Sequence, residues 1–229
     1  SDLYYSIVIT TISFFKYNSN KFWAFRQMAE SHKFFENNPK IILYKLLGTG
    51  AGDGFLWPDF STYSILILWK KEEFANEFIS KSDHSKIMEK KAYSRHDYFM
   101  QPIQTHGSWD GINPFKNCLV EKNKEDKIGI ITRGKVRLSK QIDFWLNVPQ
   151  ASNAIKRAKD VEFYKGIGEL PFLAQATFSV WKNLDSVMNF AYKSKDHSDI
   201  IKKTRKRNWY SEDMFTRFII KKNIETSLN

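Results

Sequence analysis

An internal repeat constrains the fold of this 229-residue chain more than any other feature. Four groups of similar residues occur in the same order in the two halves. They are Phe22-Trp23 with Phe144-Trp145, residues 44–48 with 164–168, residues 64–70 with 178–182, and His84-Ser85 with His197-Ser198. Chance could give one such match, but four in a fixed order indicate a duplicated unit.

Hydrophobic patterning predicts the same order of secondary structure in each half. Runs of β-branched and aromatic residues predict strands, and apolar residues three and four apart predict helices. In the first half we expect strands at 5–13, 41–47, 62–70 and 97–106, and helices at 19–35 and within 71–92. In the second half we expect strands at 128–137, 161–168, 174–181 and 214–221, and helices at 139–158, 183–193 and 197–208.

The order β-α-β-β-α-β in each half is that of the ferredoxin-like unit. One such unit leaves one sheet face bare, and burying two bare faces against each other gives an α+β barrel with helices outside. We therefore predict tandem ferredoxin-like repeats that form a single-chain, pseudo-dimeric α+β barrel. The charged stretch 116–127 is the most linker-like segment, so the predicted halves are residues 1–118 and 119–229.

The composition narrows the class of partner. The chain is 42% hydrophobic and 16% aromatic, which is enough for a sizeable core and suits a pocket for a large apolar ligand. The net charge of +11 is typical of proteins that meet nucleic acid, anionic membranes or anionic ligands. No nucleic-acid motif is present, so we expect no nucleic-acid partner. A solvated helical face is our first interpretation of the charge, and contact with a membrane surface is our second.

The single cysteine, Cys118, excludes intrachain disulfides and zinc sites built on cysteine. No run of eighteen apolar residues predicts a transmembrane helix. The N-terminal residues lack the charged and small-residue features of a secretory signal. We therefore expect a cytoplasmic protein, with peripheral contact at a membrane as an option.

Several chemistries lack their motifs. The glycine-rich stretch 48–55 has no Gly-Lys-Ser/Thr ending, so it predicts a wide turn or a lid and not a phosphate loop. The chain has no G-x-S-x-G nucleophile elbow and no H-E-x-x-H zinc pair. No glycine fingerprint opens a β-α-β dinucleotide unit. Hydrolase, zinc and nicotinamide functions are unsupported.

The predicted helix 197–208 carries the residue of greatest chemical interest. His197 shares a helical face with Ile200, Ile201 and Thr204, because these residues follow it by three, four and seven positions. The imidazole is thus expected to point inward from the start of an amphipathic helix, with Asp196 as its cap. Two interpretations stay open, which are a metal ligand and a core histidine satisfied by one hydrogen bond.

The chain resembles the spheroidene monooxygenase family of carotenoid-modifying enzymes from about Ile9 to Phe218. Six segments carry the resemblance by their order and spacing. They are W-A-F-R-Q-M at 23–28, Y-K-L-L-G-T-G-A-G-D-G-F at 44–55, G-S-W-D-G-I-N-P-F at 107–115, F-W-L-N-V-P at 144–149, the stretch 165–181, and the stretch 197–218 with W-Y-S-E-D-M-F-T-R-F. No single segment is diagnostic.

The resemblance implies a haem b enzyme that uses oxygen and an electron donor to oxygenate the C-2 position of acyclic carotenoids. It also implies the wider group of haem proteins on dimeric α+β barrels, in which a helix of one half supplies the axial histidine. His197 fits that position, and His84, its repeat partner, is the competing candidate. His32, His96 and His106 lie in segments that we expect to be wet or connecting.

Four further residues are candidates for the haem site. Haem propionates are anionic and need cations nearby, for which we consider Lys165 and Arg217. Oxygen activation needs a polar group over the iron, for which we consider Arg133 and Gln175. A surface salt bridge is an equally good account of Lys165 and Arg217.

Three functions stay open on the sequence alone. The first is a haem monooxygenase acting on a long polyene. The second is a haem enzyme of the same fold acting on a small substrate, such as an aldoxime dehydratase or a peroxidase-like protein. The third is a cofactor-free barrel that binds a hydrophobic ligand.

Overall fold

The computed structural model describes residues 8–51, 57–123, 125–156, 158–170, 174–193 and 195–228. The elements of the first half are β1 (Ile9–Lys16), α1 (Lys21–Glu30), η1 (Ser31–Phe34), β2 (Ile41–Gly50), β3 (Pro58–Trp69), α2 (Glu72–Lys81), α3 (Asp83–Glu89) and β4 (Ser94–Gly107). The elements of the second half are β5 (Ile128–Val136), η2 (Leu138–Lys140), α4 (Gln141–Lys156), β6 (Val161–Leu170), β7 (Ala174–Trp181), α5 (Leu184–Lys193), α6 (Lys195–Arg207) and β8 (Tyr210–Ser227).

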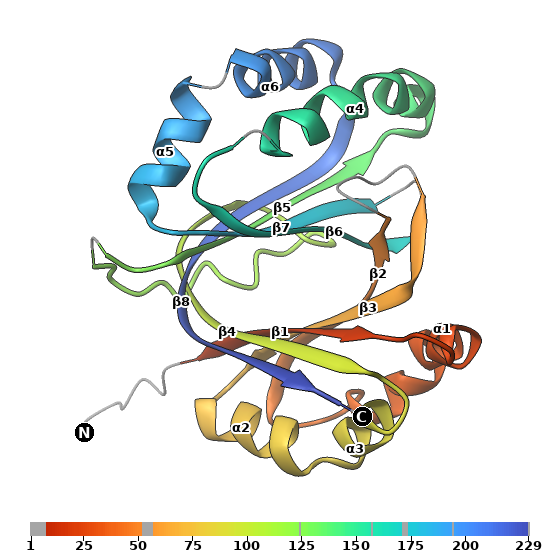
Figure 1. The fold of residues 1–229 in the computed structure, drawn as a ribbon. Helices are drawn as coiled ribbons and strands as arrows, with labels where there is room; N and C mark the ends of the chain where they lie inside the picture. The colour runs from red at the N-terminus through yellow and green to blue at the C-terminus, as the bar shows by residue number, and fades with distance from the viewer. Residues whose placement is uncertain are drawn as a thin grey trace. The chain divides into compact units, whose positions relative to one another are not determined.

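The two halves repeat the same order of elements, which confirms the predicted duplication of a β-α-β-β-α-β unit. The hydrogen-bonded strand order is β1-β3-β2-β6-β7-β5-β8-β4 and closes on itself (Figure 1). The strand pairs described in register are antiparallel. The predicted α+β barrel class is therefore confirmed.

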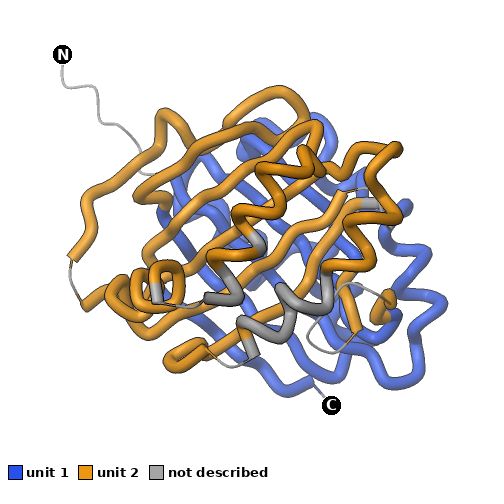
Figure 2. Tube along the Cα trace, turned by 90° about the horizontal axis from the view of Figure 1, so that it is seen from above, with its two compact units in different colours: residues 1–48, 60–101, 220–229 blue, residues 49–59, 102–219 orange. Residues whose placement is uncertain are grey.

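The chain divides into two compact units (Figure 2). Unit 1 comprises residues 1–48, 60–101 and 220–229, and unit 2 comprises residues 49–59 and 102–219. Each unit thus takes most of one half of the repeat, together with a short segment from the other half. The boundary at residues 118 and 119 stays a prediction.

In unit 1 the helices cover one face of the sheet and bury a continuous core. This face includes Phe15, Tyr63, Ile65 and Trp69, which pack with residues from α1, α2 and α3. Aromatic rings fill much of the space between the layers, because Phe78 of α2 lies 5.1 Å from the Trp69 ring and 5.5 Å from the Phe35 ring. We call this face of each sheet the helix side.

Among the described residues of unit 2, the helix layer packs on the sheet in two separate clusters. One cluster joins Ile128, Ile130, Trp181 and Ile219 of the sheet to Val187 of α5. The other joins Val136 to Phe144 of α4 and to Trp209. Figure 1 shows α4, α5 and α6 together on one side of β5 and β7. The sheet positions between these two clusters are therefore of special interest.

Element boundaries mostly agree with the sequence expectations. The stretch 71–92 holds two helices, because α2 ends at Lys81 and the Ser82 hydroxyl accepts a hydrogen bond from Ser85 N–H at 3.0 Å, capping α3. The expectation that His96 and His106 lie in connecting segments is wrong, since both lie in β4. The wide turn or lid expected at 48–55 falls partly on residues 52–56, outside the described residues. Among the described residues, the helices are too short or too polar to cross a membrane.

Candidate functional site

The sequence directs attention first to α6, the helix that carries His197. The helix begins at Lys195, so Asp196 lies in its first turn and not at the capping position expected from the sequence. The side chain of His197 lies outside the described residues, and its role as an axial ligand stays a prediction. Helix α6 packs beside α4 and α5 in the helix layer of unit 2. The sheet surface beneath that layer can be examined directly.

Strand register identifies equivalent positions in the sheets of the two units. In unit 1, β1 and β3 pair so that Ile9 faces Trp69, and in unit 2, β5 and β7 pair so that Ile128 faces Trp181. The two tryptophans are partners in the sequence repeat, and both belong to buried clusters on the helix side. Because strand side chains alternate between faces, every second residue from these pairs also lies on the helix side.

Equivalent positions on the helix side carry very different residues in the two units. In unit 1 they are Phe15, Tyr63, Ile65 and Ile67, which are all buried. In unit 2 they are Gly134, Gln175, Thr177 and Ser179. Two aromatic and two aliphatic side chains are thus replaced by a hydrogen atom and three smaller polar groups. At Gly134 the Tyr210 ring takes the space, because a Cβ there would lie 2.3 Å from its Cε1. At the other three positions unit 2 has smaller polar side chains, and therefore less apolar volume, between its sheet and its helices.

Solvent partly reaches Gln175 and Thr177, whereas Gly134 and Ser179 are buried. Thr132 is exposed, although it lies on β5 between Ile130 and Val136, which are buried against the helix layer. Thr132 pairs with Thr177 on one side and with Phe215 on the other, and both are partly exposed. We call Thr132, Gln175, Thr177 and Phe215 the helix-side strip. The unit 1 equivalent of Thr132 is Ser13, which is buried.

His106 borders the helix-side strip and was missed by the sequence reasoning. Its ring stacks on Phe215 with a centroid distance of 5.2 Å and an interplanar angle of 19°. The imidazole is exposed, so it can exchange protons with solvent next to the strip. The signal that could have found it is alternation, because the strand predicted at 97–106 already places Gln104 and His106 on one face.

Arg217, a predicted propionate ligand, also lies on the helix side of unit 2, paired in register with Ile130. Its guanidinium donates to Gln104 Oε1 at 2.9 Å and lies 5.2 Å from the Phe215 ring centroid. Its Nε is buried and has no hydrogen-bond partner among the described residues. Burial lowers the pKa of Arg217, while Tyr192 opposes that change.

Arg217 lines a pocket of about 360 Å³. The other lining residues are Ile103, Gln104, Val120, Glu121, Lys122 and Leu184. Two cations and one carboxylate therefore border this pocket. An anionic group of a ligand would be stabilised here.

Arg133, a predicted distal residue, lies on the opposite face of the unit 2 sheet. Its partner in register is Ala176, whereas the neighbouring pair Gly134 and Gln175 faces the helices. The guanidinium of Arg133 is buried and lies 2.7 Å from a Glu212 oxygen and 3.2 Å from an Asp110 oxygen. These ion pairs give Arg133 a structural role, and its catalytic role stays a prediction without support from this geometry.

The segment 107–115 is held to the sheet by this arginine and by tight backbone contacts. The Arg133 guanidinium lies 5.0 Å from the Trp109 ring, and Trp109 donates to Glu169 at 3.0 Å. Gly107 has a φ of +78°, and a Cβ there would lie 2.1 Å from the carbonyl oxygen of Asp213. Only glycine fits this position.

The carboxylate of Glu212 is the acceptor that ties segment 107–115 to β8. Burial would raise the pKa of Glu212, but hydrogen bonds from Gly111 N–H at 2.7 Å, from Arg133 and from Ser108 outweigh it and lower the pKa to about 2. The group is therefore ionised at neutral pH. A permanently ionised acceptor suits a structural anchor better than a proton donor.

Lys165, the second predicted propionate ligand, lies on the face away from the helices. It pairs in register with Phe178, the neighbour of Ser179 on the opposite face. Its amine forms an ion pair with Asp59 at 2.9 Å, and both side chains are mostly buried. Lys165 and Arg217 are thus not brought together by the sheet. The role of Lys165 at a propionate stays a prediction.

His84, the competing axial ligand, lies in a packed site of unit 1. The rings of Phe34, Phe35 and Phe78 lie 5.2, 5.0 and 5.7 Å from its centroid, and its Nε2 lies 3.2 Å from the Ser31 hydroxyl. Burial and then the charge of Arg95 lower the pKa of His84 to about 4. The imidazole is 1% exposed, so the described side chains leave no room beside it for a macrocycle.

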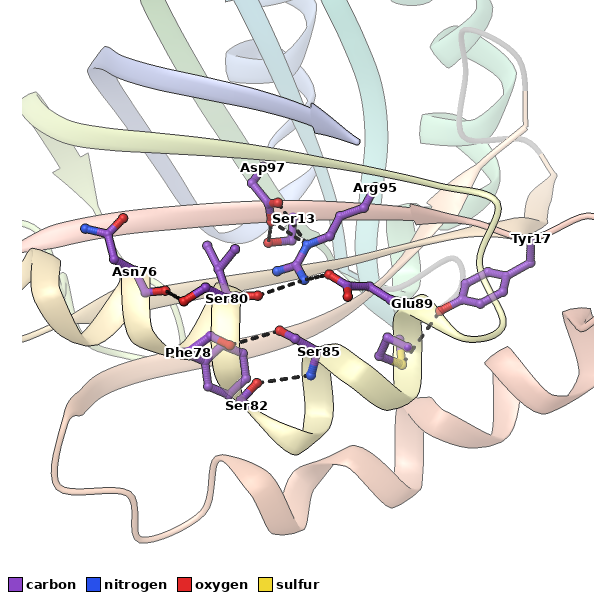
Figure 3. Close-up of polar contacts among 12 residues, drawn as sticks. Ser13, Tyr17, Asn76, Phe78, Ser80, Ser82, Ser85, Glu89, Arg95 and Asp97 are labelled. Atoms are coloured by element: carbon purple, nitrogen blue, oxygen red, sulfur yellow. Dashed lines mark hydrogen bonds and ion pairs between the residues drawn. The ribbon is translucent and has the colours of Figure 1, made fainter. Parts of the chain in front are cut away.

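A buried ionic network stabilises the same side of unit 1. Arg95 lies 2.8 Å from Asp97 and 2.9 Å from Glu89, and Asp97 also accepts a hydrogen bond from Ser13. Figure 3 shows Arg95 between these carboxylates and above α3. Arg95 and Asp97 are 2% and 1% exposed. Charges this well paired require close packing around Arg95.

Comparison with known proteins identifies the family. The chain is 34% identical over 214 residues to the spheroidene monooxygenase of Cereibacter sphaeroides, covering 92% of this chain and 66% of that protein. It is 30% identical over 182 residues to the spheroidene monooxygenase of Rubrivivax gelatinosus, covering 79% of this chain and 69% of that protein. The chain belongs to the spheroidene monooxygenase family. The name describes oxidoreductases, so the predicted enzyme class is confirmed.

Other comparisons agree on the family and on the fold. A further spheroidene monooxygenase, from Rhodobacter capsulatus, is 28% identical over 214 residues and covers 92% of this chain and 89% of that protein. No protein-family model matches the chain. A crystal structure of aldoxime dehydratase is similar with a TM-score of 0.66 at 9% identity, covering 100% of this chain and 87% of that one. At this identity the likeness supports the fold alone.

Within this spheroidene monooxygenase family member, the predicted residues separate by sheet face. Gln175 and Arg217 lie on the helix side of unit 2, under the layer to which α6 belongs. Arg133 and Lys165 lie on the opposite face and are held in ion pairs. The donor set on the helix side fits a haem group. It offers a helix with a histidine, an arginine with an unsatisfied Nε, and accessible polar groups on the sheet.

Proposed function

We propose that this protein is a haem-dependent monooxygenase that oxygenates an acyclic carotenoid at its C-2 position. The three curated relatives are named spheroidene monooxygenase, which supports a carotenoid substrate. The observation that supports a cofactor is the loss of apolar volume on the helix side of unit 2. At three equivalent positions unit 1 has the bulky buried side chains Tyr63, Ile65 and Ile67, and unit 2 has Gln175, Thr177 and Ser179.

In this proposal the residues that would hold the haem lie on α6 and on the helix side of the unit 2 sheet. His197 of α6 would supply the imidazole ligand of the iron, and Arg217 would supply a cation for a propionate. Haem iron held by a single axial histidine supplies the oxygen-activating chemistry when it is bound. The buried Nε of Arg217 then gains the acceptor that it lacks among the described residues.

The remaining residues of the strip position the reactants. Gln175 and Thr177 are partly exposed polar groups on neighbouring positions of one face, so they can donate hydrogen bonds to bound oxygen. His106 can deliver a proton from solvent, because its ring is exposed and fixed by stacking on Phe215. The Phe215 ring offers an apolar contact for a polyene. Incorporation of one oxygen atom from O₂ also requires two electrons, so the proposal includes an electron donor.

The first experiment tests haem binding through His197. The purified protein is titrated with haemin, and the Soret band and the ligand-field bands are recorded. We expect the protein to bind one equivalent of haem and to show the absorption spectrum of histidine-ligated haem. This spectrum should be lost in His197→Ala and retained in His84→Ala. Binding that survives His197→Ala but not His84→Ala would contradict the assignment of the ligand.

The second experiment tests the substrate. The haem-loaded protein is supplied with O₂, a chemical reductant and either an acyclic carotenoid or a small aldoxime. We expect a product heavier by one oxygen, or the corresponding 2-oxo product, from the carotenoid only. Turnover of the aldoxime alone would favour the small-substrate function. A protein that binds the carotenoid but never takes up haem would favour the cofactor-free barrel.

A further inference from the structure

An unusual row of exposed aliphatic residues lies on the helix layer of unit 2. Leu138 of η2 and Ile142 and Leu146 of α4 are 79%, 81% and 77% exposed. They are spaced four residues apart, so they lie along one side of the helical segment. We call these three residues the α4 stripe.

The α4 stripe is not explained by packing within the protein. The opposite side of α4 is already occupied by the core contact of Phe144, which lies 5.6 Å from the Trp209 ring. Single exposed aliphatic residues are common on protein surfaces. Three nearly fully exposed ones in a row indicate a surface that is covered by something else.

A basic surface adjoins the α4 stripe. Helix α6 packs beside α4, and Arg207 at its end forms an ion pair with Asp143, a neighbour of Ile142. Asp143 also accepts a hydrogen bond from Trp209 at 2.7 Å, which fixes the contact between the two helices. Three exposed cations of α6 follow this contact towards its start. They are Lys202, Arg205 and Lys206.

We propose that the α4 stripe and the exposed cations of α6 bind the surface of an anionic lipid bilayer. Aliphatic side chains that can enter the boundary of the acyl chains, next to lysine and arginine that meet anionic headgroups, form the usual pattern of interfacial binding. The net charge of +11 adds a long-range attraction to such a surface.

A second copy of the chain is a poorer occupant for this surface. A symmetric pair joined through the α4 stripe would bring two basic α6 helices close to each other. Each chain carries a net charge of +11, so this arrangement is repulsive. The anionic bilayer satisfies both the apolar and the charged parts of the surface. This inference does not depend on haem or on the substrate.

The experiment measures binding of the full chain to sedimenting vesicles, either phosphatidylcholine alone or a mixture with about one third phosphatidylglycerol. Two double variants and one single variant are compared with the parent. Ile142→Ser with Leu146→Ser removes two of the three aliphatic side chains of the α4 stripe, and Lys202→Gln with Lys206→Gln removes two of the exposed cations of α6. Phe22→Ser is the matched control, because Phe22 is 77% exposed on α1, the repeat equivalent of α4.

We expect the parent and Phe22→Ser to bind the phosphatidylglycerol vesicles. Both double variants should bind these vesicles at least about tenfold more weakly than the parent does. High salt should weaken the parent as well, because screening shortens the range of the charge interaction. Circular dichroism and thermal melting verify that each variant is folded. Binding by the parent that neither double variant weakens, or no binding at all, overturns the proposal. A concentration-dependent dimer lost in Ile142→Ser with Leu146→Ser would assign the stripe to a second copy and also overturn it.

Discussion

In unit 1 the strands β1 and β3 direct Phe15, Tyr63, Ile65 and Ile67 at the helices, whereas unit 2 has Gly134, Gln175, Thr177 and Ser179 at the same register. The unit 1 side chains form one continuous core with the helices. In unit 2 the core is divided into two clusters, and Thr132 between them is exposed. A common backbone pattern therefore carries one packed face and one accessible face.

This difference suggests how a duplicated domain divides its tasks. One copy retains the apolar volume that stabilises a small α+β unit, and the other loses some of it and gains polar groups where a ligand can be held. Charged residues differ between the two units in the same way. Asp97 of the buried unit 1 network is replaced in register by Phe215 of the helix-side strip. Stability and function are thus expected to respond to mutation in different units.

The largest expected effect is at the buried network of unit 1. Asp97→Ala removes the buried carboxylate partner of Arg95, which is 2% exposed, and leaves this guanidinium only the partly exposed Glu89 as a partner. We expect a loss of about 3–5 kcal/mol in the free energy of unfolding, measured by urea denaturation. The control Arg26→Ala breaks a solvent-exposed pair with Glu30 and should leave the unfolding free energy nearly unchanged. Equal losses in the two variants would mean that Asp97 is not a buried partner.

The next effect comes from exchanging residues between equivalent positions. Ile65→Thr places a hydroxyl in the unit 1 core, where Ile65 is 5% exposed, and should cost about 2–4 kcal/mol in unfolding free energy. Thr177→Ile makes the reverse change in unit 2. It should leave stability within about 1 kcal/mol, because Thr177 is partly exposed, and it should weaken haem binding by filling the strip. Calorimetry and haemin titration measure the two quantities.

The two exchanged variants form a matched pair, since each introduces the residue of the other unit at the same register position. Ile65→Thr should leave haem affinity unchanged. If Thr177→Ile bound haem as well as the parent does, the helix-side strip would not be the cofactor surface. If Ile65→Thr cost no stability, the contrast between the packed and the accessible face would be lost.

The repeat made the fold accessible to sequence reasoning. Strong β-branched runs such as residues 62–70 and the order of elements in two halves restrict the chain to few topologies. The pairing of Ile9 with Trp69 and of Ile128 with Trp181 follows from that order. The fold class and the position of α6 were therefore predictable.

The arrangement of the candidate site was harder to predict, because one residue of offset moves a side chain to the other face of a sheet. Gln175 and Arg133 are both polar strand residues, yet Gln175 faces the helices and Arg133 faces away. The carboxylates that neutralise Arg133 come from segment 107–115 and from β8, far away in the sequence. A residue-by-residue alignment of the two repeats, including Phe15 with Gly134, would have indicated the accessible face.

The third effect is a pH dependence contributed by unit 1. The pKa of His84 is lowered from 6.5 to about 4, chiefly by burial, so the folded state keeps the ring neutral where the unfolded state protonates it. The stabilisation is complete above about pH 6.5 and is lost as the pH falls from there towards 4. Between pH 7 and 4.5 we expect His84 to account for about 2 kcal/mol of lost unfolding free energy.

The measurement compares urea denaturation of the parent and of His84→Leu across this pH range. The leucine variant has no ring to protonate and should lose about 2 kcal/mol less stability than the parent. Parallel curves for the two proteins would show that His84 is accessible to protons in the folded state, and its assignment as a packed residue of unit 1 would be wrong.

The smallest effect separates the two cations first considered for the propionates. Lys165 is paired with Asp59 on the face away from the helices, so Lys165→Met should cost about 1 kcal/mol of stability and leave haem affinity within about twofold. Arg217→Met removes a cation from the helix side, where its Nε has no partner among the described residues. It should weaken haem binding by about tenfold, because a charge-assisted hydrogen bond is lost. Haemin titration of both variants measures the difference. An equal loss of haem affinity in both variants would contradict a site on one face, because the two cations lie on opposite faces of the sheet. A loss of haem affinity in Lys165→Met alone would place the site on the face that also carries Arg133.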